Sequence, residues 1–212
     1  MPDTPRLVLF LTAASLLAIA PGPGMLYVLA RSLAGGKREG VLSAVGTFLG
    51  GLVHVFAAAL GVSVIVARSA VAFSAVKYLG AAYLVFLGIR MILGARGEDF
   101  DRETISPPLR SGHNPLWHGV ATEALNPKTA LFFLSFIPQF VSRSGGHVFL
   151  QFVMLGTISV LMNTAADLAV IALAGPLGRR IRSSAVFRRR QRTVTGAIMI
   201  GLGAYLAAGE SK

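Results

Sequence analysis

The sequence predicts an all-α integral membrane protein with six transmembrane helices, arranged as two inverted three-helix repeats. The 212 residues are 54% hydrophobic and only 14% charged, with a mean hydropathy of +0.67, which is too apolar for an ordinary soluble domain. Residues 7–30 contain no charged side chain, and residues 41–67 contain none apart from His54 when it is protonated. Each run is longer than the about 20 apolar residues that a helix needs to span a bilayer. A lipid bilayer is therefore the expected solvent of the chain.

Six apolar segments occupy nearly the whole chain. The first has a small-residue stretch at 18–20 that is similar to a signal-peptide cleavage site, but Pro21 follows and the apolar run continues, so we expect a retained helix. The later segments are less apolar, and Lys or Arg near their ends would reach toward the lipid headgroups. The predicted spans are residues 7–30, 41–67, 70–94, 117–141, 148–176 and 193–209.

A long polar stretch divides these spans into two sets of three. Residues 94–114 carry four acidic residues and Pro107-Pro108 among basic side chains, which is typical of a solvated linker. Because each half has an odd number of spans, the two halves must be inverted relative to each other in the membrane. The predicted units are a first three-helix repeat at residues 1–94, a cytoplasmic linker at 95–116 and a second three-helix repeat at 117–212.

Matching residues in the two halves support an internal duplication. The second and fifth spans share Gly-Thr, at residues 46–47 and 156–157, and the third and sixth share Gly-Ala, at residues 80–81 and 196–197. Each pair alone carries little weight in a chain rich in glycine and alanine. Their common order, together with a proline break in both the first and the fourth span, favours a duplication.

The two proline breaks predict a binding site. Proline removes a backbone donor and clashes with the preceding turn, so each break frees polar groups that lipid cannot satisfy. Matching breaks in two halves indicate a midplane binding site of a secondary transporter, although a kink that only aids packing is the alternative for either break alone. The expected site residues are Pro21, Gly22 and Pro23 in the first span and Asn126, Pro127 and Lys128 in the fourth.

The basic residues are distributed unevenly among the connections. The net charge is +11, and the run FRRRQR at residues 187–192 resembles a nucleic-acid-binding patch. However, 14 of the 20 basic residues lie in or beside the connections after the first, third and fifth spans, which share one side of the membrane. By the positive-inside rule that side is cytoplasmic, so both termini are expected on the extracytoplasmic side of the cell (inner) membrane. The arginine run then anchors the topology near anionic lipid, and no nucleic-acid partner is expected.

Asp167 and Glu123 are the candidate sites for a coupling ion. A carboxylate in hydrocarbon is costly unless it is paired, hydrated or protonated. Asp167 ends a stripe of small and polar residues in the fifth span, so this face should point inward. Glu123 lies nearer the start of the fourth span, where a place in the membrane interface is an equal alternative. A structural ion pair or hydrogen bond is the alternative for Asp167. The stripe consists of Gly156, Ser159, Asn163 and Asp167.

Lys128 directly follows the proline of the second break, and its ammonium would hold a substrate carboxylate. The alternative is that Lys128 only neutralises Glu123 or Asp167. Asn126 would donate and accept hydrogen bonds beside the opened backbone.

His54 is a weaker candidate for the transport path. It lies on a stripe of small and polar residues in the second span, where a lone histidine more often forms a structural hydrogen bond between helices. This stripe consists of Thr47, Gly50, His54, Ala58 and Gly61.

No enzyme, metal or cofactor motif is present in the sequence. The chain has no cysteine, which excludes disulfides and thiolate metal sites within it. The histidines other than His54 lack metal-ligand spacing, and no Ser-His-Asp set, phosphate-binding loop or dinucleotide fingerprint occurs. We therefore expect no catalysis, no cofactor and no metal site.

Five motifs in order cover almost all of the chain: PGPG at 21–24, GTxxGGxxH at 46–54, KYLGAAYL at 77–84, NPK at 126–128 and PQF at 138–140. Together they resemble the LysE/RhtB family of amino-acid exporters. The resemblance implies a small membrane protein of six helices that exports amino acids or related metabolites with the proton gradient. It also implies that the two Pro motifs of the family correspond to those at 21–23 and 126–128. Members often have Asp or Asn after the first PGP, whereas this chain has Gly24.

These observations predict a secondary transporter that exports amino acids or related small metabolites, coupled to the proton gradient. Its partners would be a small amino-acid substrate and the lipid bilayer. An inorganic cation exporter that uses the intramembrane acids is one alternative, and a membrane partner subunit without transport activity is another. The sequence leaves the substrate, the coupling stoichiometry and the choice between monomer and homodimer open.

Overall fold

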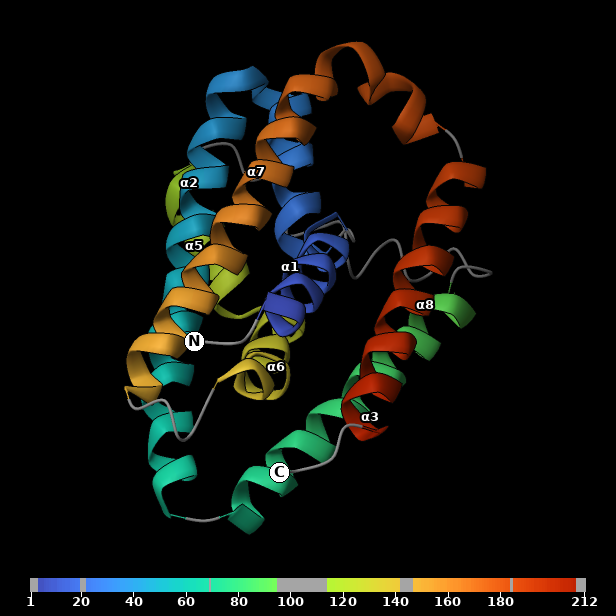
Figure 1. Ribbon diagram of the computed structural model, residues 1–212. Coiled ribbons are helices and arrows are strands. Elements are labelled where there is room, and N and C mark those ends of the chain that lie inside the picture. Colours follow the sequence, from blue (N-terminus) through green and yellow to red (C-terminus); the bar gives the residue numbers. More distant parts are fainter. Residues whose placement is uncertain are drawn as a thin grey trace.

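The computed structural model describes residues 4–19, 22–68, 70–94, 114–141, 147–183 and 185–208 (Figure 1). These residues form seven α-helices and one 3-10 helix, and no strand occurs among them, so the all-α prediction is confirmed. The helices are α1 (Thr4–Ile19), α2 (Pro23–Arg68), α3 (Ala70–Gly94), α5 (Pro115–Ala124), α6 (Pro127–Ser135), the 3-10 helix η1 (Ile137–Phe140), α7 (Val148–Ser183) and α8 (Ala185–Ala208).

The helices divide differently from the six predicted spans. Both predicted breaks are present, because α1 ends before α2 begins at Pro23 and α5 ends before α6 begins at Pro127. Whereas the breaks divide two of the predicted spans, α2 joins parts of the first two spans through Gly36, where φ is 76° and ψ is −173°. Only glycine adopts this conformation readily. The chain reverses there (Figure 1), so residues 31–40 form two helical stretches around one turn rather than an open connection.

The last predicted span also begins earlier than expected. Helix α8 starts at Ala185 rather than at residue 193, so the arginine run at 187–192 lies in its first turns and not in a connection. Arg189 and Arg190 are exposed there. Helix α7 continues past Pro176 to Ser183, and its C-terminal part bends over toward α8 (Figure 1). A proline inside a helix removes one backbone hydrogen bond and commonly causes such a bend.

Two helical segments are long and apolar enough to cross a membrane, Pro23–Gly61 and Val148–Ala174. Helix α1 and the stretches Ala81–Arg90 and Gly196–Tyr205 are apolar but shorter. Length and composition alone are weak evidence, because the core helix of a soluble protein passes the same test. The surface adds to it: Leu60, Leu79 and Leu161 are 61%, 71% and 52% exposed, and many other large apolar side chains are exposed too. Extended apolar surface of this kind suits contact with lipid.

Residues of α1, α2, α5, α6 and α7 line the cavity of the candidate site. Helix α3 packs mainly against α8 (Figure 1). An aromatic cluster next to the site packs α6 and η1 against α1. It consists of Phe10, Phe132, Phe136 and Phe140. The rings of Phe132 and Phe136 are 4.9 Å apart, those of Phe136 and Phe140 are 4.8 Å apart, and Phe10 of α1 lies 5.3 Å from Phe140. These close aromatic pairs fix α6 and η1 against α1.

Glycines bring the backbones of α2 and α5 into direct contact. A Cβ atom on Gly119 would lie 2.6 Å from the carbonyl oxygen of Ser43 and 3.1 Å from the Cα of Gly46, and one on Gly50 would lie 2.7 Å from the carbonyl oxygen of Val120. Such small residues allow helices in a membrane to approach closely. The predicted stripe in the second span is therefore confirmed for its glycine at position 50. It is wrong for Gly61, which is exposed and has no atom within 4 Å of a built Cβ.

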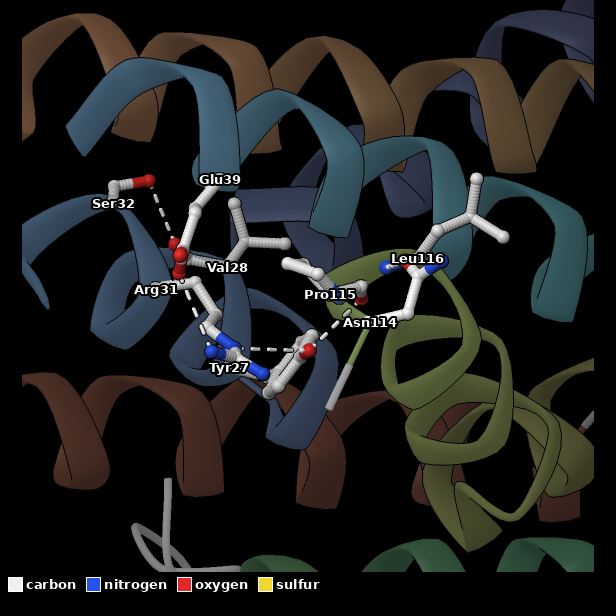
Figure 2. Close-up of polar contacts among 8 residues, drawn as sticks. All are labelled: Tyr27, Val28, Arg31, Ser32, Glu39, Asn114, Pro115 and Leu116. Atoms are coloured by element: carbon white, nitrogen blue, oxygen red, sulfur yellow. Dashed lines mark hydrogen bonds and ion pairs between the residues drawn. The ribbon is translucent and has the colours of Figure 1, made fainter. Parts of the chain in front are cut away.

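A polar cluster ties the reversal in α2 to the start of α5 (Figure 2). The Tyr27 hydroxyl donates to the carbonyl oxygen of Pro115 at 2.9 Å and accepts from Nε of Arg31 at 3.3 Å. The guanidinium of Arg31 also pairs with Glu39 across the turn, with Nη1 3.3 Å from Oε2. Asn114 caps α5 by accepting from the amide of Leu116 at 3.0 Å. Arg31 is one of the basic residues beside the connection after the first span, and it is a buried structural residue.

Candidate functional site

The break between α5 and α6 is organised by Asn126. Proline is favoured at the first position of a helix, and asparagine is favoured just before it. Asn126 accordingly caps α6, because its Oδ1 accepts from the amide of Lys128 at 3.0 Å. Its Nδ2 donates at 3.1 Å to Oε2 of Glu123, one turn earlier in α5. The predicted break is therefore a fixed turn with defined partners.

Glu123 is held at both carboxylate oxygens. Oε1 accepts from the hydroxyl of Thr129 at 2.6 Å, and Oε2 accepts from Asn126. The residue is only 7% exposed. Its carboxylate lies against the first turn of α2, where a Cβ atom added to Gly24 would overlap Oε2. The positive end of a helix dipole favours a carboxylate at this place.

Lys128 joins the two breaks. Its Nζ donates at 3.3 Å to the carbonyl oxygen of Leu17, in the last turn of α1. The last four carbonyls of a helix lack partners within it, and a cation there is favoured by the helix dipole. Gly22 lies beside the same side chain, since a Cβ built on it would be 3.3 Å from Nζ. The side chain of Lys128, in the second break, therefore satisfies a backbone carbonyl at the end of α1, beside the first break.

Asp167 faces the site from α7. Its Oδ2 accepts a hydrogen bond of 3.0 Å from the hydroxyl of Thr47 on α2, and the residue is 5% exposed. The predicted inward face of the fifth span is confirmed, because Gly156 and Ser159 are buried with it and Asn163 is half-buried. Asp167 thus has fewer hydrogen-bond donors than Glu123 within the described part of the chain.

These groups line one cavity of about 40 Å³. Cavities that hold a whole small-molecule ligand commonly measure about 300 to 1,000 Å³. The cavity in this structure is therefore much smaller than one that holds such a ligand. The polar side chains that line it include Thr47, Glu123, Asn126, Lys128, Asn163 and Asp167.

Of the eight predicted site residues that the structure describes, five line this cavity and three do not. The five are Gly22, Glu123, Asn126, Lys128 and Asp167. Pro21 lies outside the described residues. Pro23 and Pro127 begin α2 and α6 without lining the cavity. His54 is placed behind Glu123, where its Nε2 donates to the carbonyl oxygen of that residue at 2.8 Å and its ring stacks on Phe133.

Sequence reasoning missed several lining residues. Thr47 and Asn163 were on the two predicted stripes, so their inward direction was readable but their part in the site was not. Thr129 gave no signal, because its role depends on the geometry of the α6 cap. The apolar lining was missed entirely and includes Leu17, Met25, Phe132, Phe133 and Val160.

Gly24→Ala is expected to lower the free energy of unfolding of the purified protein by about 1.5 to 3 kcal/mol, and with it the melting temperature. The added methyl group would displace the Glu123 carboxylate and break its hydrogen bonds to Asn126 and Thr129. The matched control is Gly61→Ala, at an exposed helical glycine with open space around it. Thermal unfolding of both variants in detergent measures the effect, and equal melting temperatures for both would contradict this account of Gly24.

Relatives align with almost the whole chain. A membrane protein of Pseudomonas aeruginosa is 36% identical over 197 residues, which cover 89% of this chain and 88% of the relative. A membrane protein of Vibrio cholerae is 30% identical over 206 residues, which cover 95% of this chain and 96% of the relative. A protein of Klebsiella pneumoniae named leucine efflux protein is 28% identical over 206 residues, which cover 95% of this chain and 94% of the relative. No solved structure matches the chain.

A family model described as LysE type translocator matches residues 15–210. The matched region contains both helix breaks and all the residues that line the cavity. The resemblance read from the sequence motifs is confirmed, and with it the membrane class. Translocators of this kind are transporters rather than enzymes. The chain therefore belongs to the LysE type translocators, a family of membrane transport proteins.

Proposed function

We propose that this protein is a secondary transporter that exports amino acids across the cell (inner) membrane in exchange for protons. The observation that carries the proposal is the meeting of the two helix breaks around one cavity that contains Lys128, Glu123 and Asp167. Buried charges in a membrane protein mark substrate and ion pathways. Broken helices at such a site supply the backbone groups that bind polar substrates.

The charged groups of the cavity match the two ends of an amino acid. Lys128 and the amides at the start of α2 would bind the substrate carboxylate, because a cation and a helix N-terminus both favour an anion. Asp167 would bind the substrate ammonium and, in alternation, a proton. Since one carboxylate cannot hold both cations at once, export of substrate would be linked to entry of protons. Glu123 is better suited to a structural role, because both of its oxygens already accept hydrogen bonds.

The apolar lining supports a substrate with an uncharged, apolar side chain. Leu17, Met25 and Val160 come from three different helices, and Phe132 and Phe133 come from α6. A charged substrate side chain would have to displace these groups or remain unpaired. Relatives from Klebsiella pneumoniae and Salmonella choleraesuis carry the name leucine efflux protein, which agrees with this substrate class.

The packing of the helices supports the proposed arrangement of six spans in two inverted repeats. Each broken span packs its first half-helix against a helix of the other half: α1 against α7, and α5 against α2. The third spans of the two halves, α3 and α8, pack against each other, and Gly88 and Gly196 make reciprocal close contacts there. Such reciprocal packing is expected of inverted repeats. The positive-inside rule predicts that both termini lie on the extracytoplasmic side.

The test is amino-acid release from cells that overproduce the protein, after loading with a mixture of peptides, with and without a protonophore. We expect selective release of one or a few apolar amino acids, lost when the protonophore collapses the proton gradient. Cells without the protein are the control, and immunoblots of membranes establish its amount. Absence of selective release from protein present in the membrane would contradict export. Selective release that the protonophore leaves unchanged would contradict proton coupling alone.

A further inference from the structure

The hydroxyl of Thr47 lies between two acceptors. Its Oγ1 is 3.0 Å from Oδ2 of Asp167 on α7 and also 3.0 Å from the carbonyl oxygen of Ala44, one turn earlier in α2. Thr47 is 5% exposed, as is Asp167, so both groups are largely shielded from solvent. A threonine hydroxyl carries one hydrogen and two lone pairs, so it donates to one of these acceptors at a time.

The charge of Asp167 decides which acceptor receives that hydrogen. When Asp167 is ionised, its carboxylate attracts the hydroxyl hydrogen in a charge-assisted bond, and the bond to Ala44 is given up. When Asp167 is protonated, its own hydrogen on Oδ2 points to Oγ1 of Thr47, and the threonine hydrogen turns to the carbonyl of Ala44. The Thr47 hydroxyl therefore has a hydrogen-bond partner for its hydrogen in both states, and no proton passes through Thr47.

We infer that Thr47 is the positioning residue that lets Asp167 exchange its bound proton, by serving as donor to the ionised carboxyl and as acceptor from the protonated one. This inference rests on the proposed function and goes beyond it, because it assigns the residue that sets the pH range of the exchange. A hydroxyl is required, since an apolar side chain would leave a buried charge without its donor.

Thr47 is favoured over the other polar groups near Asp167. The charged groups that line the cavity with Asp167 are Glu123 from α5 and Lys128 from α6, and His54 on α2 lies behind Glu123. Among the described residues that line the cavity, α1 contributes no charged side chain. Of the described hydrogen bonds, the bond from Thr47 is the one that reaches the carboxyl of Asp167.

The experiment measures the pH dependence of leucine binding to the purified protein in detergent. Protons should compete with leucine at Asp167 in the parent, which defines a pH of half-maximal binding. Thr47→Val keeps the shape of the side chain and removes the donor to the ionised carboxyl, so this midpoint should rise by about one pH unit. Thr47→Ser keeps the hydroxyl and should retain the midpoint of the parent. Thr47→Ala is a second variant without a hydroxyl if the valine variant is poorly produced.

A purely structural role predicts a different result. Loss of packing would lower the amount of folded protein or its melting temperature without moving the midpoint. The inference is overturned if Thr47→Val and Thr47→Ala bind leucine with the midpoint of the parent while Asp167→Asn abolishes the pH dependence. A parent that binds leucine equally at every pH would instead overturn the proposed proton exchange, and the inference with it.

Discussion

Asp167→Asn should reduce net amino-acid export to the level of cells that lack the protein. The amide has nearly the shape of the carboxyl and can still accept the hydrogen bond from Thr47, but it neither carries a negative charge nor releases a proton. Loss of a charge-assisted hydrogen bond to the substrate ammonium should weaken leucine binding by about 10- to 100-fold. Release from overproducing cells measures the first effect, and leucine binding to purified protein measures the second.

The matched control is another acid outside the cavity. Glu39 pairs with Arg31 near the reversal of α2, and its side chain is 37% exposed. Glu39→Gln removes an equal charge at a site where a partly exposed pair contributes only about 0 to 1 kcal/mol, so export should persist. If Asp167→Asn exports like the parent at equal membrane levels, Asp167 is not the exchanging group.

Lys128→Met should abolish the preference of the protein for a substrate carboxylate. Methionine has a similar length without the charge. The variant also removes the donor to the Leu17 carbonyl, and it leaves Glu123 and Asp167 without this cation beside them. We compare binding of leucine with binding of leucinol, which lacks the carboxylate. The parent should prefer leucine by about 10- to 100-fold, and the variant should bind both alike.

The comparison separates recognition from damage to the fold. A general loss of structure would weaken leucine and leucinol binding together and leave their ratio as in the parent. That result would assign Lys128 to the structural role in which it only holds the end of α1. A melting temperature measured on the same preparations records how much the lost contact with Leu17 costs.

Proline and asparagine made the helix breaks predictable, because their effects are local. Proline at the first position of α2 and of α6 acts through its own backbone, and Asn126 caps α6 through an amide two residues away. The inward direction of Asp167 was readable for the same reason, since helical spacing fixes which residues share a face. The family motifs agree with these local signals and with the matched range of residues 15–210.

Long-range partners were not predictable in this way. The contact of Lys128 with Leu17 spans 111 residues, and that of Thr47 with Asp167 spans 120. From the sequence, Asp167 was expected on an inward face, whereas a place in the membrane interface was an equal alternative for Glu123. The structure separates them, because Asn126 and Thr129 occupy both oxygens of Glu123.

The sequence by itself determined that the chain is helical and apolar, that two helices break at proline, and which polar residues face inward. Each of these depends on a residue and its near neighbours. Only the tertiary structure decided that the two breaks meet and that Thr47 reaches Asp167. Those outcomes depend on how whole helices pack, and the free energy of that packing is a sum over contacts between residues far apart in the chain.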